Sequence, residues 1–302
     1  MYYNISTKKG LLAGLLLSAL TAAPAMAKIT PSDVFMQTQR GLAEVELIRS
    51  NKGIGIAARK VGVQKKKRPL HVFGKCVEVV EKVVRLQELN SVSLSVIPDI
   101  PLRDVTPSEV HDCTQVAIDG LRAVKEKLGI AAKIAESDGV KKKTPSHVYR
   151  NMWQLSYLLD TLVGQISPSE VFRNVKSMQD ELAMVAKEKS ITLTGSVVAV
   201  TGKKPGDVLI SCFNGLTLLK KVQRKLKVSQ LKVPKVPSGK ILPSDAYDCT
   251  NTQLTELHVI KVELGMTKHR VRQTAPTGKT PSDVFAEMEL YKKQVAQVVS
   301  KL

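Results

Sequence analysis

Four cysteines are the residues whose type and spacing most clearly predict covalent chemistry in this chain. They form two pairs, Cys76 with Cys113 and Cys212 with Cys249, and the members of each pair are 37 residues apart. An even number of cysteines in a matched layout is typical of disulfide-bonded exported proteins. We therefore expect the disulfides Cys76–Cys113 and Cys212–Cys249, although four cysteines allow three connectivities. The alternative is a redox-active or metal-binding thiol pair, which no Cys-x-x-Cys motif supports.

Clusters of basic residues are the second candidate for chemistry. The chain has 46 Lys and Arg against 27 Asp and Glu, a formal net charge of +19. Three clusters stand directly before expected helix starts, where the helix dipole also attracts anions. They are Lys65, Lys66, Lys67 and Arg68; Lys141, Lys142 and Lys143; and Lys203 and Lys204. We expect them to bind an anionic partner, such as an envelope lipid, a glycan or another polyanion.

A simpler interpretation of these clusters is that the lysines are solvated and are partly offset by acidic residues in the first turn of each helix. The sequence carries no nucleic-acid-binding motif, and aromatic residues make up only 4% of it. Nucleic acid is therefore a disfavoured partner. The sequence carries no signal that selects an oligomeric state.

Three histidines, His71, His111 and His147, would lie near Cys76 and Cys113 if the helix starts meet at one end. Imidazole and thiolate are good zinc ligands. The equivalent positions in the second half of the chain are Asp207, Tyr247 and Asp283. Because the second half lacks the set, we expect neither a bound metal nor another cofactor.

Catalytic motifs are not found in the sequence. It has no Gly-rich phosphate loop, no Gly-x-Ser-x-Gly and no His-Glu-x-x-His. We therefore expect a non-catalytic binding protein. The alternative is a ligand-sensing or carrier bundle with an interior pocket near the fourth and eighth helices. Trp153, with Met152, Tyr157 and Leu158, makes the fourth helix apolar nearly all round, which predicts burial where two modules meet.

A repeated six-residue phrase, approximately Thr-Pro-Ser-Asp-Val-Phe, predicts the elements that position these residues. Its prolines are at positions 31, 69, 107 and 145, and again at 168, 205, 243 and 281, so the spacing within each group is 38 residues, once 37. The residue before the proline can cap a helix, and proline suits the first helical position. An acid at the third helical position can accept a hydrogen bond from the cap and complements the helix dipole. Each phrase therefore predicts a helix start.

Each phrase is followed by about 20 residues with apolar side chains three and four positions apart, which predicts eight amphipathic helices. We expect an all-α protein made of two tandem homologous four-helix modules, 28–166 and 167–302, in which each repeat is one helix plus a long linker. A solenoid with one helix per repeat is the alternative.

The helix directions also follow from the sequence. Linkers such as 51–68 are long enough to run back along a helix. The cysteines lie near the starts of the second and third helices of each module, so a disulfide requires these helices to be parallel. The short segment 164–166 predicts that the fourth and fifth helices are antiparallel or sharply kinked.

The first 27 residues have the pattern of a secretory signal peptide. Lys8 and Lys9 precede an apolar stretch at 11–23, and Ala25 and Ala27 supply a small-x-small cleavage site. We therefore expect a periplasmic or secreted protein, with no transmembrane segment after residue 27.

Overall fold

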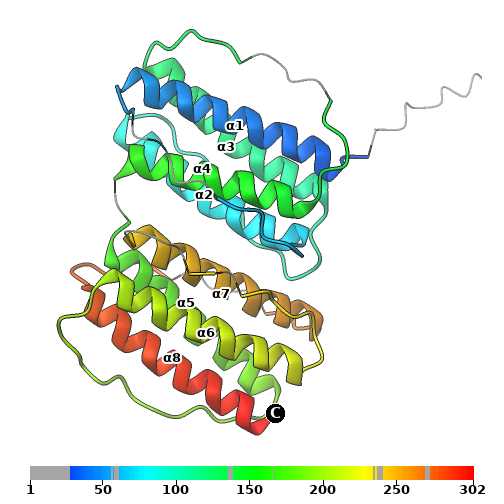
Figure 1. Cartoon of the computed structure of the whole chain (residues 1–302), viewed down its shortest axis with the longest axis vertical. Coiled ribbons are helices and arrows are strands. Elements are labelled where there is room, and N and C mark those ends of the chain that lie inside the picture. The colour runs from blue at the N-terminus through cyan, green and yellow to red at the C-terminus, as the bar shows by residue number, and fades with distance from the viewer. Residues whose placement is uncertain are drawn as a thin grey trace, which may run out of the picture.

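The structure, a computed structural model, describes residues 28–55, 57, 61–134, 139–164, 166–233, 235–236, 241–268 and 273–302. These residues form eight α-helices and no strand (Figure 1). The helices are α1 (Pro31–Asn51), α2 (Pro69–Leu89), α3 (Pro107–Lys127), α4 (Pro145–Val163), α5 (Pro168–Glu188), α6 (Pro205–Lys225), α7 (Pro243–Glu263) and α8 (Pro281–Lys301). The predicted all-α fold, with helices about 38 residues apart, is confirmed. The predicted signal peptide, residues 1–27, lies outside the described residues.

Every helix begins at the proline of a repeated phrase, and the third helical residue secures the start. In α1 the carboxylate of Asp33 accepts a hydrogen bond of 2.8 Å from the backbone N–H of Thr30. The same bond is made by Glu109, Glu170, Asp207, Asp245 and Asp283. In α2 and α4 the acceptor is instead the Nδ1 atom of a histidine, His71 or His147. Each of the eight phrases is therefore a capped helix start.

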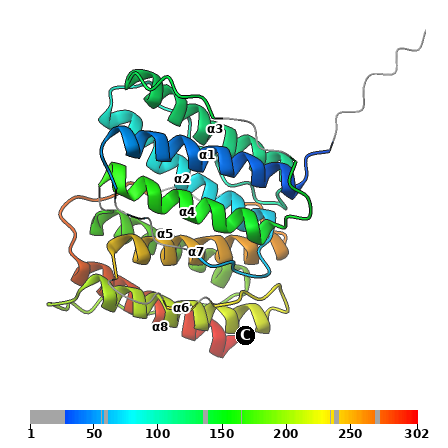
Figure 2. The ribbon, with the colours of Figure 1, turned by 45° about the horizontal axis from the view of Figure 1, so that its top comes forward.

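The helices pack as two closed rings of four. In the first ring the order is α1, α3, α2, α4, and in the second it is α5, α7, α6, α8. Each ring encloses its own apolar core, in which valine and leucine predominate. Because α1 closes on α4 and α5 closes on α8, the helices form bundles and not the alternative open solenoid (Figures 1 and 2).

All four helices of a bundle run in the same direction. In the first bundle the four starting prolines line one shallow depression, so the helix starts meet at one end. In the second bundle the segments before α6 and α8 hydrogen bond to the starts of α8 and α5. The long linkers therefore return along the bundle before each new helix begins, as the sequence predicts.

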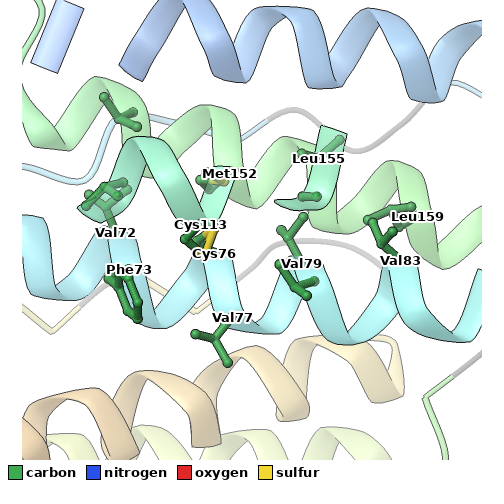
Figure 3. Packing of buried hydrophobic residues seen from close by; sticks show 14 of the residues in the cluster. Val72, Phe73, Cys76, Val77, Val79, Val83, Cys113, Met152, Leu155 and Leu159 are labelled. Atoms are coloured by element: carbon green, nitrogen blue, oxygen red, sulfur yellow. A yellow bond between two sulfur atoms is a disulfide. The ribbon is translucent and has the colours of Figure 1, made fainter. Parts of the chain in front are cut away.

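Each bundle contains one disulfide, and both predicted pairings are confirmed. Cys76–Cys113 joins α2 to α3, and Cys212–Cys249 joins α6 to α7, each with a Cα–Cα distance of 6.3 Å. In Figure 3 the first disulfide lies in the core beside Met152 of α4, whereas Val77 points out of the bundle toward α7. The bridges fix the parallel helix pairs near their starts.

The two bundles pack against each other in opposite directions. Along the contact of α2 with α7, Arg68 meets Glu263, His71 meets Glu256 and Lys75 meets Asp248, so the sequence positions rise on α2 as they fall on α7. Gly164, with φ of +78°, ends α4 and begins the turn into α5. The expected reversal between the fourth and fifth helices is confirmed. The starts of the two bundles consequently lie at opposite ends of the molecule (Figure 1).

Each bundle also contains a buried ion pair at the same repeat positions. Glu44 of α1 accepts a hydrogen bond of 2.6 Å from Lys125 of α3, and Glu181 of α5 accepts one of 2.6 Å from Lys261 of α7. Matching contacts of this kind fit the predicted tandem duplication, which stays a prediction.

Candidate functional site

The lysine two positions before a helix proline attaches its segment to the neighbouring helix start. The backbone N–H of Lys67 donates to Ser146 Oγ at 3.1 Å, and its Nζ lies 4.7 Å from the ring centroid of Tyr149. Lys143 makes the same two contacts with Ser32 and Phe35. The second bundle repeats the arrangement with Lys203 on Ser282 and Phe285, and with Lys279 on Ser169 and Phe172. Three of the predicted anion-binding lysines, Lys67, Lys143 and Lys203, therefore have a packing role.

The other basic residues divide between the two ends of the molecule. Lys65, Lys66, Lys141 and Lys142 are exposed beside the helix starts of the first bundle, and none forms an ion pair with a described residue. Arg68 is at the same end, and its guanidinium pairs with Asp104 and Glu263. Lys203 and the exposed Lys204 precede α6 at the opposite end. The structure thus brings the first two predicted clusters together and separates the third from them.

The two ends differ in how far acids offset the helix dipoles. In the second bundle the third residue of every helix is an acid: Glu170, Asp207, Asp245 and Asp283. In the first bundle only α1 and α3 have an acid there, Asp33 and Glu109. Hydrogen bonds from Arg103 and Thr106 lower the pKa of Glu109 to about 2, so this carboxylate stays ionised. α2 and α4 have His71 and His147 at this position instead. At the start of α2, carboxylates of α7 lie close by, because His71 contacts Glu256 and Arg68 pairs with Glu263. The start of α4 has no acid at its third position to offset the dipole beside Lys141 and Lys142.

The centre of this end is apolar. The depression between the four helix starts is lined by the first and fourth residues of each helix: Pro31, Val34, Pro69, Val72, Pro107, Val110, Pro145 and Val148. We call Lys65, Lys66, Lys141 and Lys142 together with these prolines the first helix-start surface. It combines an apolar centre with a positively charged rim.

A second polar site lies where the bundles meet. Lys75 Nζ is 2.8 Å from both Asp248 Oδ1 and Glu78 Oε2, and all three side chains are buried. Trp153 Nε1 donates to Asp248 Oδ2 at 2.6 Å. Trp153 is therefore partly buried where the two bundles meet, on the side of α4 that the sequence predicts to be covered. The network continues to Lys82, which pairs with Asp160 at 2.7 Å.

Burial and neighbouring charges separate the pKa values of the two central carboxyl groups. Burial, and then the charge of Glu78, raises the pKa of Asp248 to about 8. Burial also opposes ionisation of Glu78, but the charges of Lys75 and Lys82 outweigh it and lower the pKa to about 2. At neutral pH the proton of this pair is therefore on Asp248, and Glu78 is the carboxylate that faces Lys75 and Lys82.

This network predicts a pH dependence of stability. Folded Asp248 binds a proton that the unfolded chain has lost, so its contribution falls as the pH rises from about 4 to about 8. The side chain introduced by Asp248→Asn does not titrate. In this variant the free energy of unfolding should therefore fall less steeply with pH, by up to about 1.4 kcal/mol per pH unit, which is the slope for one proton. Urea unfolding followed by Trp153 fluorescence at pH 5, 6, 7 and 8 measures this slope. Asp112→Asn, at an exposed acid of α3, is the control, and equal slopes in wild type and Asp248→Asn would contradict the assignment.

This network is not predicted from the sequence. Lys75, Glu78 and Lys82 are three and four positions apart on α2, which places them on one helix face. Such spacing is also typical of solvated helix faces, so it did not single them out. The partner Asp248 is 173 residues from Lys75, and only the packing of the bundles reveals the contact.

The histidines of the first bundle are engaged at helix starts. His71 accepts the N–H of Arg68 through Nδ1, and its Nε2 lies 3.0 Å from Glu256 Oε1. His147 accepts the N–H of Thr144. His111 Nδ1 is 3.6 Å from the carboxylate of Asp112. Within the described ranges, no group of three or more His, Cys, Asp or Glu residues is placed to hold a metal ion.

The interior pocket expected near the fourth and eighth helices stays a prediction. α8 packs against α5 and α6 on the side of the second bundle that faces away from the first (Figure 1). α4 and α8 therefore belong to separate bundles and pack against different helices. A cleft of about 270 Å³ lies between α2 and α7, beside the buried network.

No protein-family model, curated protein or solved structure matches this chain. None of the described helices is both long enough and apolar enough to cross a bilayer.

Proposed function

We propose that the chain is an exported, non-catalytic protein that binds an anionic lipid surface through the first helix-start surface. The observation that carries the proposal is the group of four exposed lysines beside the helix starts of the first bundle, where α4 has no acid at its third position. A helix start without a compensating carboxylate attracts phosphate groups. The two disulfides are compatible with an oxidising compartment outside the cytoplasm.

The apolar centre favours a lipid surface over a uniformly charged polymer. The four prolines at the centre of this surface can contact the boundary between the lipid headgroups and the acyl chains. The ammonium groups of the surrounding lysines can contact the headgroups at the same time. A glycan or another polyanion would use the lysines alone. The packing roles of Lys67 and Lys143 keep the exposed lysines beside the prolines.

The test is binding to vesicles of phosphatidylglycerol and phosphatidylcholine, compared with phosphatidylcholine alone. A basic residue near an anionic membrane contributes about 1 kcal/mol, so the variant K65Q/K66Q/K141Q/K142Q should bind about 10²- to 10³-fold more weakly. The matched control is K52Q/K127Q/K133Q/K204Q, which removes four exposed lysines at the other end of the molecule.

An equal loss in both variants would mean that net charge and not this surface drives binding, and would overturn the proposal. Binding to heparin without binding to vesicles would favour a glycan partner. Affinity should also fall as salt is raised, because exposed charges are screened.

A further inference from the structure

The cleft between α2 and α7 is built from both bundles and has a rigid roof. Its walls are α2 and α7, and its roof is the segment 97–100 of the linker between α2 and α3. Pro98 and Pro101 restrict the roof backbone. The roof is also held to the second bundle, because His258 Nε2 hydrogen bonds to the carbonyl oxygen of Pro101 at 2.6 Å. Ligand pockets are often found at interfaces between domains and are usually formed before the ligand binds.

The lining is acidic in a strongly basic protein. Three carboxylates line the cleft, Glu78 and Glu81 on α2 and Asp99 on the roof, and no lysine or arginine lines it. Glu78 is neutralised by the buried lysines. Glu81 accepts a hydrogen bond from Tyr247 at 2.6 Å and forms an ion pair with Arg173 at 3.5 Å. Asp99 is exposed and forms no ion pair with a described residue. The negative charge available to a ligand is therefore that of Asp99 on the roof.

The equivalent positions of the second bundle show that these acids are not part of the repeated design. α2 and α6 begin at Pro69 and Pro205, 136 residues apart. At the same offset the roof sequence Ile-Pro-Asp-Ile-Pro at 97–101 becomes Val-Pro-Lys-Val-Pro at 233–237. The residues equivalent to Glu78, Glu81 and Asp99 are Asn214, Thr217 and Lys235. All three acids are thus found only in the first half of the chain, which supplies α2 and the roof.

The remaining lining selects the kind of cation. Val77, Ile97, Ile100 and Leu254 contribute apolar surface to the otherwise polar cleft. No described group of carboxylates converges closely enough to hold a metal ion. An organic ammonium ion fits a cleft that has apolar lining residues and carboxylates but no group of metal ligands. Its apolar part can fill the cleft while its ammonium group meets a carboxylate.

We propose that the cleft between α2 and α7 binds a small organic amine, with its apolar part against Val77 and Leu254 and its ammonium group toward Asp99. This site is separate from the first helix-start surface, and it has the opposite sign of charge.

Isothermal titration of the full chain with 2-phenylethylamine, and with its neutral isostere 2-phenylethanol, tests the site. The amine should bind more tightly than the alcohol. Asp99→Asn should weaken amine binding, and Asp99→Lys, which installs the residue found at position 235, should weaken it by about tenfold or more. Asp112→Lys makes the same charge change at an exposed acid on α3 and should leave binding unchanged.

The proposal is overturned if the amine does not bind, if the alcohol binds as tightly, or if Asp112→Lys weakens binding as much as Asp99→Lys. Asp99 lies on an exposed linker, so its variants are expected to fold, and far-UV circular dichroism checks this.

Discussion

Replacing Lys261 with methionine is expected to lower the free energy of unfolding of the second bundle by about 3–5 kcal/mol, because the change leaves a buried carboxylate without a partner. The Lys261 side chain is fully buried, and its ammonium group donates to Glu181 at 2.6 Å. The Glu181 side chain is 2% exposed, so water cannot replace the lost partner. Urea unfolding followed by far-UV circular dichroism measures the loss.

The equivalent pair of the first bundle is a matched control. Glu44 is bonded by Lys125 at 2.6 Å and also by Arg122 at 3.1 Å. Lys125→Met therefore leaves Glu44 with a cation and should cost clearly less than Lys261→Met. The double variant Glu181→Leu/Lys261→Met removes both charges and should recover most of the loss. Equal costs for Lys125→Met and Lys261→Met would contradict the role assigned to Arg122.

The sequence predicted the elements of the fold because the signals for them are local. A proline, a cap and a third-position acceptor lie within four residues of each other, so each helix start could be recognised without knowing its neighbours. Even the altered phrases at Pro69 and Pro205 begin helices. The disulfides were predictable for a related reason: Cys76 and Cys113 lie near the starts of helices that long linkers allow to be parallel.

The interface between the bundles was not predictable, because nothing in the spacing of α2 distinguishes a buried charge from a solvated one. Gly74 illustrates the difference: a Cβ there would lie 2.7 Å from Thr255 Oγ1, so its absence lets α7 approach α2 closely. The equivalent residue of α6 is Ile210, which is 54% exposed and faces no such partner helix among the described residues. Only the packed structure reveals that one of two similar helices is covered on its outer face.

The basic clusters show the same limit on sequence reasoning. Lysines that were grouped by their position before a helix perform two tasks in the structure. Lys67 and Lys143 pack on aromatic rings, whereas Lys65 and Lys141 face solvent. The lysine two positions before the proline packs on a ring, whereas the lysines three or four positions before it are exposed. This difference could not be predicted from the sequence, because the ring contacts are known only from the structure.

Removing either disulfide by a double Cys→Ala change is expected to lower the free energy of unfolding by roughly 3–4 kcal/mol, the entropic value for a loop of this length. Both bridges close a separation of 37 residues, so this contribution from the unfolded chain is the same for the two. Urea unfolding of Cys76→Ala/Cys113→Ala and of Cys212→Ala/Cys249→Ala measures it. A loss below about 1 kcal/mol in both variants would contradict the pairing or the parallel arrangement.

Local opening should nevertheless differ between the two disulfide variants. Without Cys76–Cys113, α2 is still held by α3 and α4 and by its contact with α7 of the other bundle. Without Cys212–Cys249, α6 is held by α7 and α8 within its own bundle. Hydrogen exchange should therefore increase more in peptides from 205–225 than in peptides from 69–89. The entropy of loop closure is the same for the two disulfides, so the difference in exchange measures what the contact with the second bundle contributes to the stability of α2. Equal exchange in the two segments would mean that the buried network at Lys75 adds no local stability.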